Sequence, residues 1–386
     1  MRVLLDVSAV PSDPRGAGRY VSELARHVVT GATPDLEVVL LARRDDAARW
    51  RAVAADASDV EVVVHPVVPG PRPVRLVWEQ VAGPRLARRL ALDVWHGPHY
   101  TVPLRAALPR VVTVHDLTLL EHPEWHERPK ALYFGRMIPA AVKHAAVSVC
   151  VSRHTADRLA AVVPAAAGAR ARDVVVIPHG VDHDRFRPVS DPALDLATLG
   201  RFGVCAPYLA FLGTIEPRKD VASLVHAFAA VAPEHPDLQL VLAGGGGWHD
   251  GAVDAAIAAS GVAERVVRTG YLPDDVVPAL LRRAAAVVYP SLEEGFGLPA
   301  LEALACGAPL VTTGGSSIEE FVGDAALLVA PGDTDALVAA LRRVLVPHEA
   351  SALAARGPAQ AAPYTWRAAA DRHVDAYRRA AASRSS

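Results

Sequence analysis

The sequence of 386 residues carries a net charge of −2 at pH 7, and 51% of its residues are hydrophobic. A chain of this length exceeds a single typical core and fits two domains of about 150 to 200 residues each. The nearly balanced charge provides no bulk attraction to nucleic acid, and no segment resembles a nucleic-acid-binding module.

The cysteines and the apolar runs indicate the compartment. Cys150, Cys205 and Cys306 lie in apolar surroundings without CxxC spacing, which favours a reducing compartment and argues against a zinc site. No apolar run is long enough to span a bilayer. The first residues read as a strand rather than a signal peptide, because Asp6 interrupts the apolar run. We therefore expect a cytoplasmic protein.

Short β-branched runs alternate with Ala-, Leu- and Arg-rich stretches, which is typical of βαβ units and of a parallel sheet covered on both faces. We expect the strands of a first domain at 2–7, 36–41, 60–64, 111–114, 147–151 and 174–177. A second set is expected at 208–212, 238–243, 265–268, 286–289, 309–312 and 326–329. Between the two sets, residues 185–206 are proline-containing and weakly periodic, which indicates a linker.

The first domain opens with a glycine loop. Gly16 and Gly18 lie between the first strand and the first helix. The segment matches the dinucleotide fingerprint GxGxxG only in part, because the third glycine is absent. An ordinary turn is the alternative reading.

Histidines and an acid gather near the ends of two apolar runs. His115 and Asp116 follow the strand at 111–114, at the carboxyl end where ligands bind parallel sheets. A buried histidine with a structural role is the alternative. His96, His99 and His115 lack a carboxylate or cysteine partner at ligand-like spacing, so we expect no metal site from them.

Two DxD triplets and a basic stretch each allow a functional and a structural interpretation. Residues 182–184 lie at the start of the linker and 333–335 cap a helix, so we expect neither triplet to bind a metal. The stretch 72–89 interleaves arginine with large apolar residues, which would suit weak peripheral contact with an anionic membrane. Solvated helix faces, interrupted at Gly83 and Pro84, are favoured over that contact.

The second domain places two cations after its first strand. Arg218 and Lys219 follow the strand at 208–212, and lysine occurs elsewhere only at positions 130 and 143. Cations at this position would stabilise the charge that develops on a departing diphosphate. A solvated helix start is the alternative reading.

The segment from Glu294 to Glu302 sets two carboxylates around a glycine turn that opens an apolar helix. The helix should begin near Gly297, accept Pro299 in its first turn and end near Gly307. Both carboxylates could then reach one ligand lying across the helix N-terminus. An ordinary helix start with acidic residues is the alternative.

This segment, with its glutamate, seven residues and glutamate, resembles the motif of the family-4 retaining glycosyltransferases. The resemblance runs almost end to end. It implies an α/β fold with two Rossmann-like domains facing each other across a cleft, the GT-B arrangement. Residues 1–190 would form the acceptor-side domain, 205–365 the nucleotide-sugar domain, and the helix 366–380 would pack back on the first.

The resemblance also implies roles for individual residues. Glu294 and His115 would contact the donor sugar, Glu302 the ribose, and Lys219 with Arg218 the diphosphate. Asp116 would orient the sugar ring or the acceptor. The acceptor-side loop would include His99 and Tyr100, and the remaining donor contacts would come from Gly16, Gly18, Gly213, Thr214, Gly295, Phe296, Gly297 and Leu298. Thr214 stands where the commonest family pattern has arginine, which indicates a subgroup.

The implied activity is transfer of a hexose, with retention, from a GDP-, UDP- or dTDP-sugar to an acceptor hydroxyl. Mannose from GDP-mannose is our preferred donor, and the acceptor would be a glycan, a lipid-linked sugar or a small molecule. No cofactor and no metal are expected. A sugar-nucleotide epimerase or phosphorylase on the same fold, and an inactive nucleotide-sugar-binding module, remain the alternatives.

Overall fold

The computed structural model describes residues 1–12, 14, 16–31, 35–57, 62–164, 173–247 and 251–383. The chain forms two compact units. Unit 1 comprises Met1–Pro123, Arg128–Gly180 and Tyr364–Ser386, and unit 2 comprises Glu124–Glu127 and Val181–Pro363. Among the described residues, no helix is both long and apolar enough to cross a membrane.

The described part of unit 1 is built on a parallel sheet with the strand order β3-β2-β1-β4-β5-β6-β7. Its strands are β1 (Arg2–Asp6), β2 (Glu37–Arg43), β3 (Val62–Val68), β4 (Val94–Gly97), β5 (Arg110–Val114), β6 (Val147–Cys150) and β7 (Asp173–Val176). The strand order reverses between β1 and β4, so the chain leaves these two neighbours in opposite directions. This point of divergence lies beyond Asp6 and Gly97.

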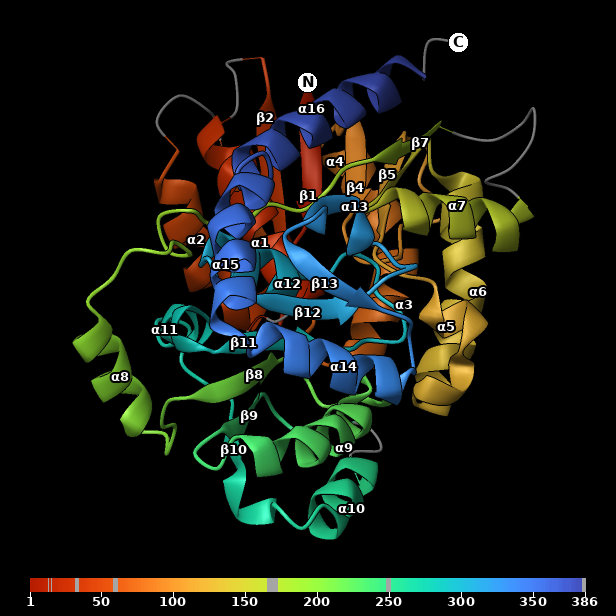
Figure 1. Ribbon diagram of the computed structural model, residues 1–386. Helices are drawn as coiled ribbons and strands as arrows, with labels where there is room; N and C mark the ends of the chain where they lie inside the picture. Colours follow the sequence, from red (N-terminus) through yellow and green to blue (C-terminus); the bar gives the residue numbers. More distant parts are fainter. Residues whose placement is uncertain are drawn as a thin grey trace. The chain divides into compact units, whose positions relative to one another are not determined.

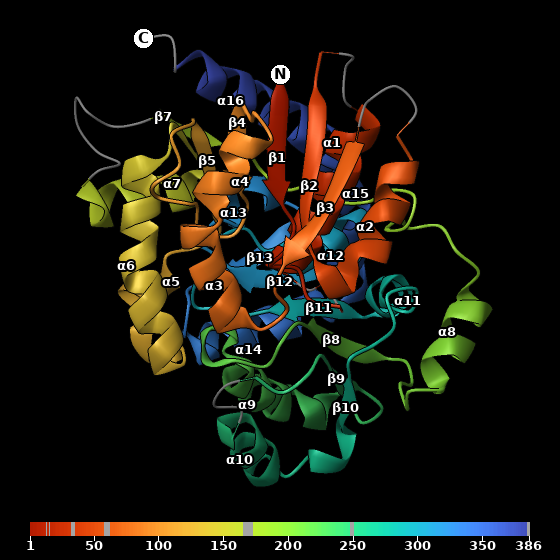
Figure 2. The ribbon, with the colours of Figure 1, turned by 180° about the vertical axis from the view of Figure 1, so that it is seen from behind.

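Helices cover both faces of this sheet. They are α1 (Ala17–Gly31), α2 (Ala47–Ala55), α3 (Arg72–Val81), α4 (Gly83–Arg89), α5 (Thr118–Glu121), α6 (Arg128–His144), α7 (Arg153–Val162) and α16 (Trp366–Ala382). Figures 1 and 2 show α1 and α16 on one face and α3 and α4 on the other. The pleat of β4 follows this division, since Trp95 packs in a cluster with Leu86 of α4 while His96 bonds to Tyr377 of α16.

The described part of unit 2 repeats the plan with the parallel strand order β10-β9-β8-β11-β12-β13. Its strands are β8 (Tyr208–Leu212), β9 (Gln239–Ala243), β10 (Val266–Gly270), β11 (Ala286–Tyr289), β12 (Leu310–Thr313) and β13 (Ala326–Val329). Its helices are α8 (Pro192–Gly200), α9 (Val221–Val231), α10 (Gly251–Ala259), α11 (Val277–Arg283), α12 (Leu298–Ala305), α13 (Glu319–Val322), α14 (Thr334–Val344) and α15 (Pro347–Ala361). Here the order reverses between β8 and β11.

The expected fold class of two Rossmann-like α/β domains is confirmed. The expected strands coincide with the observed ones to within a few residues, although positions 60 and 61 lie outside the described residues. One strand, β4, was not expected, because its four residues, which end in glycine and are followed by proline, are too few to show a period. The linker expected at 185–206 was also only partly right, because it contains the helix α8.

A buried carboxylate holds α8 against α11. Arg282 donates two hydrogen bonds to Asp195, from Nε to Oδ2 at 3.0 Å and from Nη2 to Oδ1 at 2.9 Å. Ser190 also donates to Asp195, and Arg283 lies 3.3 Å away. Burial alone would raise the pKa of Asp195, but the bonds from Arg282 and Ser190 outweigh it and hold the pKa below its ordinary value.

We predict that Asp195→Asn loosens α8. Losing the charged hydrogen bonds should speed amide exchange in α8 by about 10- to 150-fold, equivalent to about 1.5–3 kcal/mol. Because the folded pKa is depressed, this stabilisation is present above the ordinary pKa of 3.8 and is lost as the pH falls through the folded value. Native-state hydrogen exchange should therefore show acid-dependent loosening in the wild type but not in Asp195→Asn.

The matched control for this prediction is Asp335→Asn, which changes an exposed acid in the first turn of α14. Exchange in α8 should stay at the wild-type rate in this control. Equal exchange of α8 in Asp195→Asn and in the control would show that the carboxylate does not hold the helix.

Candidate active site

The candidate site in unit 2 forms where β8 and β11 lie side by side. After β8, the chain passes Gly213 and Thr214 and makes the short 3-10 helix Pro217–Lys219. After β11, it forms the turn that contains Glu294 and then begins α12. Because the carboxyl ends of neighbouring parallel strands meet at one edge, Lys219 and Glu294 come together across 75 residues of sequence.

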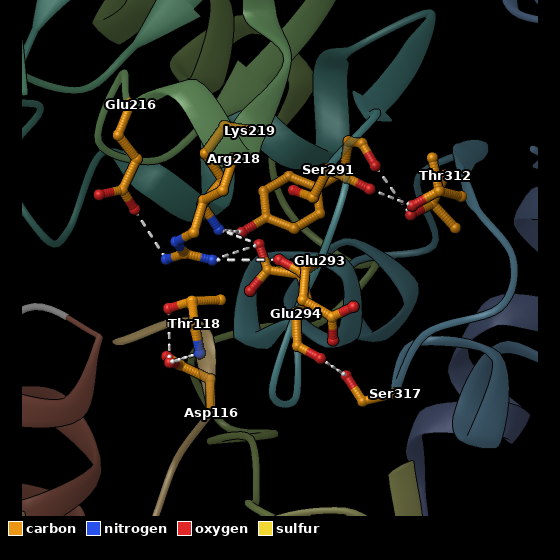
Figure 3. A network of polar contacts seen from close by, with 12 residues as sticks. Asp116, Thr118, Glu216, Arg218, Lys219, Ser291, Glu293, Glu294, Thr312 and Ser317 are labelled. Carbon is orange, nitrogen blue, oxygen red and sulfur yellow. Dashed lines mark hydrogen bonds and ion pairs between the residues drawn. The ribbon is translucent and has the colours of Figure 1, made fainter. Parts of the chain in front are cut away.

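These residues form a compact cluster of charges, drawn in Figure 3. Lys219 Nζ donates to Glu294 Oε1 and to the hydroxyl of Tyr289. Arg218 Nη1 lies 3.0 Å from the same Glu294 oxygen, and Arg218 Nη2 lies 2.7 Å from Glu216 Oε1. Lys219 is only 5% exposed and Glu294 only 6%. The two cations expected to hold a diphosphate therefore share one buried carboxylate.

Burial and mutual contact set the protonation of the cluster. Burial would raise the pKa of Glu294, but Arg218 and Lys219 reverse that effect and bring it to about 2. Burial, with the neighbouring charge of Arg218, lowers the pKa of Lys219 to about 8, although Glu294 opposes the shift. Near neutral pH the cluster therefore holds an ionised carboxylate, a guanidinium and a lysine whose proton is held less firmly than usual.

Backbone contacts fix the turn that carries Glu294. Ser317 Oγ donates to the carbonyl of Glu294 at 2.8 Å, and Thr313 Oγ1 donates to that of Ser291 at 2.6 Å. The amide of Leu292 donates to the carbonyl of Arg218 at 2.8 Å, which ties the two strand-end loops together. The Glu294 carboxylate is therefore held by a turn that is anchored on both sides.

Glycines permit the close approach of these loops. Gly297 is the N-cap of α12 with φ of +94°, and a Cβ there would lie 2.6 Å from Ile318 Cγ1. Gly244 has φ of +146°, and its Cβ would lie 1.9 Å from the carbonyl oxygen of Gly213. Glycine is thus favoured at both positions, because the neighbour is a buried side chain at Gly297 and backbone at Gly244.

The other predicted donor residues lie around the same turn. Phe296 stacks on Phe321 with ring centroids 5.1 Å apart, and Gly295 is buried beside it in sequence. Leu298 opens α12, where it is partly exposed, and Thr214 is partly exposed after β8. Glu302 lies on the second turn of α12 and is buried. Their contacts with a donor remain a prediction.

His115, predicted to contact the donor sugar, and the predicted acceptor-side residues lie in unit 1. His115 follows β5 and is buried, and its Nε2 donates to the carbonyl of Pro98 at 2.9 Å, since a carbonyl can only accept. Burial lowers the pKa of His115, so the ring is neutral near pH 7. The amide of Asp116 donates to Tyr100 Oη at 3.2 Å. Thr118 donates to Asp116 Oδ1 through its amide and its hydroxyl, as Figure 3 shows.

Two of these residues have unusual environments. Tyr100 has φ of +66°, a left-handed conformation that costs free energy for a residue with a side chain. His99 Nδ1 is buried and has no hydrogen-bond partner within the described part of the chain. Burial, with the nearby charges of His115 and Lys130, lowers the pKa of His99 to about 3. Strain and an unpaired polar atom both mark the loop after β4.

The predicted glycines of the first loop also lie in unit 1. Gly16 has φ of +48°, and a Cβ there would meet no atom within 4 Å. Gly18 lies in the first turn of α1, where a Cβ would approach Pro11 Cδ to 3.1 Å. Arg15, which begins this loop, lies outside the described residues.

His96 has a structural environment. Its Nδ1 and the hydroxyl of Tyr377 are 2.8 Å apart, and its Nε2 and the hydroxyl of Thr113 are 2.9 Å apart. Tyr20 bonds to the same Thr113 and to His373 of α16. This buried network joins α16 to β4, β5 and α1. Among the described residues, no group of three or more His, Cys, Asp or Glu side chains could hold a metal ion.

A pocket in unit 1 was not expected from the sequence. Asp6, Glu79 and Lys130 line it together with His99, but none of the three belongs to a motif. Asp6 directly ends β1, and that position was the available signal. Residues of the basic stretch 72–89 lie in two different environments. Arg72 and Arg75 line this pocket. Val74, Val77 and Val81 are exposed on α3. The break at Gly83 and Pro84 is confirmed, because α4 begins there.

Comparisons with known proteins define the class. The family model Glycosyltransferase Family 4 matches residues 14–185, and Glycosyl transferases group 1 matches 206–346. An O-antigen chain mannosyltransferase B of Escherichia coli is 32% identical over 290 residues, which is 74% of each chain. Together these matches define a glycosyltransferase.

Solved structures agree on the fold. Sucrose-phosphate synthase from Thermosynechococcus elongatus superposes with a TM-score of 0.76 and 19% identity over 99% of each chain. HepE of Anabaena, solved in complex with UDP-glucose, has a TM-score of 0.73 and 19% identity over 97% of this chain and 99% of its own. These likenesses establish the GT-B fold class, and the family matches show that the chain belongs to glycosyltransferase family 4.

We predict that Gly297→Ala destabilises unit 2 more than alanine does at a left-handed glycine with no close neighbour. Alanine at φ of +94° costs about 1–2 kcal/mol, and displacing the buried Ile318 adds about 1–3 kcal/mol. Thermal unfolding should show the larger shift for this variant. The control is Gly261→Ala, where φ is +71° but a Cβ would meet nothing within 4 Å. Equal losses in both variants would contradict the packing argument.

Proposed function

We propose that this protein is a retaining glycosyltransferase that moves a hexose from a nucleotide sugar to an acceptor hydroxyl. The observation that carries the proposal is the buried cluster of Arg218, Lys219 and Glu294 at the strand ends of unit 2. Cations that are fixed before the donor arrives can stabilise charge as it develops on a departing diphosphate.

The proposed reaction breaks one bond and forms one. The bond between the sugar C1 and the diphosphate oxygen breaks, and a bond from C1 to the acceptor oxygen forms on the same face of the sugar. The proton of the acceptor hydroxyl passes to the departing phosphate oxygen. The leaving group thus serves as the base, so neither a carboxylate nucleophile nor a metal is required.

The charge cluster suggests how the donor binds. Before binding, Glu294 balances the two cations, and the cost of burying it is offset by them. A diphosphate brings more negative charge to Arg218 and Lys219 and competes with Glu294 for them. Glu294 is then available to accept hydrogen bonds from hydroxyls of the donor sugar. Glu302 on α12 takes the ribose hydroxyls.

We further propose mannose from GDP-mannose as the donor. The support is the relative of 32% identity, an O-antigen chain mannosyltransferase. UDP- and dTDP-sugars are the competing donors, since HepE, which shares the fold, binds UDP-glucose. His115 contacts the transferred sugar, and Asp116, His99 and Tyr100 contribute on the acceptor side.

A donor panel tests this function. We expect one of the GDP, UDP, dTDP and ADP sugars to raise the unfolding temperature selectively, because a ligand that binds only the folded state stabilises it. Mass spectrometry should then detect free nucleotide and a glycosylated acceptor, with full turnover in EDTA. An isomerised donor would indicate an epimerase instead, and binding without turnover would indicate an inactive module. Loss of turnover in EDTA that magnesium restores would refute metal independence.

We predict that Lys219→Ala lowers kcat/KM by about 10- to 150-fold, because it removes one charge-assisted contact with the diphosphate. Steady-state kinetics with the donor from the panel would measure this loss. Lys143→Ala changes an exposed lysine of α6 in unit 1 and should leave kcat/KM unaltered. Turnover of Lys219→Ala at the wild-type rate would remove this residue from the mechanism.

A further inference from the structure

A pocket of about 280 Å³ lies in unit 1 where the strand order reverses. Its lining includes Asp6 and Ser8 after β1 and Gly97 to His99 at the end of β4. The helices α3 and α6 complete the wall through residues such as Arg75 and Phe134. In open parallel sheets, the crevice beyond such a reversal is where ligands bind. The location therefore points to a small-molecule site.

The charges around this pocket favour an anion. Arg72, Arg75 and Lys130 supply positive charge, while Asp6 and Glu79 are the acidic residues among the described lining. Burial, with the neighbouring charge of Asp6, raises the pKa of Glu79 to about 8. At neutral pH the Glu79 carboxyl group is therefore protonated in most molecules. The lining then carries more positive than negative charge, and this excess would be balanced by an anionic ligand.

The same pocket also offers groups that bind hydroxyls. Glu79 Oε2 accepts from Thr101 Oγ1 at 2.8 Å, and both residues line the pocket. His99 contributes the buried Nδ1 atom that lacks a partner among the described residues. The pocket also has an apolar surface, which is the ring of Phe134. The Arg72 guanidinium carbon lies 5.7 Å from the centroid of this ring. Polar edges beside an aromatic surface suit a sugar ring.

We propose that this pocket binds the acceptor and that the acceptor is a sugar bearing a phosphate. This inference rests on the proposed function. The phosphate contacts Arg72, Arg75 and Lys130, and the sugar hydroxyls contact Asp6, Glu79 and His99. The volume of about 280 Å³ lies just below the range for small-molecule sites, about 300–1,000 Å³, which suits a ligand as small as one phosphorylated hexose. The sugar phosphate is either free or the headgroup of a lipid.

The first experiment measures binding to the full chain by calorimetry. The probes are mannose 6-phosphate, glucose 1-phosphate, mannose and inorganic phosphate. We expect at least one hexose phosphate to bind about 10-fold or more tightly than mannose or phosphate alone, because only it engages both sets of groups. Equal affinity for mannose and for the hexose phosphates would overturn the proposal.

Matched variants locate the binding. Lys130→Ala should weaken the hexose phosphate by about 10- to 100-fold, whereas Lys143→Ala, on the exposed side of the same helix, should not. Arg72→Ala gives a second test, with the exposed Arg88→Ala of α4 as its control. Wild-type affinity in both Lys130→Ala and Arg72→Ala would refute the assignment of the phosphate to these cations.

Two further measurements distinguish a free from a lipid-linked sugar phosphate, and the proposed function from the pocket inference. Vesicles that carry a polyprenyl phosphate hexose should compete with the soluble hexose phosphate if the acceptor is lipid-linked, and they should not compete if it is free. Donor binding, measured by thermal shift, should be unaltered in Lys130→Ala. If no nucleotide sugar binds while the hexose phosphate does, the proposed function fails and the anion site remains. If a nucleotide sugar binds but transfer to the hexose phosphate is as fast in Lys130→Ala as in the wild type, the pocket inference fails alone.

Discussion

The reversal of strand order in each parallel sheet is the constraint on which both candidate sites depend. Neighbouring strands whose chains leave in opposite directions keep their carboxyl ends open, because no crossover helix closes the space between them. In unit 2 this brings the loops after β8 and β11 together, and in unit 1 those after β1 and β4. Most of the groups that we assign to donor or acceptor chemistry are carried by one of these loops or by a helix beside them, and His115 and Asp116 follow β5, the strand next to β4.

Burial makes the charges at these edges interdependent. Lys219 and Glu294 are almost fully buried, and each would be costly without the other, since an unpaired buried charge destabilises a fold by several kcal/mol. The pocket of unit 1 solves the same problem differently, because Glu79 is largely protonated near neutral pH rather than paired one to one. The cluster of unit 2 thus pairs its buried carboxylate with cations before a ligand binds, whereas the pocket of unit 1 keeps an excess of positive charge that an anionic ligand would balance.

Much of this arrangement could be predicted from local pattern, and some could not. The turn at Gly297, the end of α12 near Gly307 and the strands of both sheets other than β4 agree with expectation, because glycine and β-branched residues act on their own neighbourhood. The short strand β4, the docking of α8 through Asp195 and the pocket at Asp6 were missed. Each depends on partners far away in sequence: Arg282 for Asp195, and α3 and α6 for the pocket.

The sequence by itself determined the two α/β units, the family and the residue types placed at strand ends, since alternating patterns and short motifs are local properties of the chain. Only the tertiary structure decided which strand ends become neighbours. It thereby joined Lys219 to Glu294, set His96 in a buried network with Tyr377, and gathered Asp6, Glu79 and Lys130 around one pocket. The physical reason is that strand order and helix docking follow from long-range packing, which no short window of sequence contains.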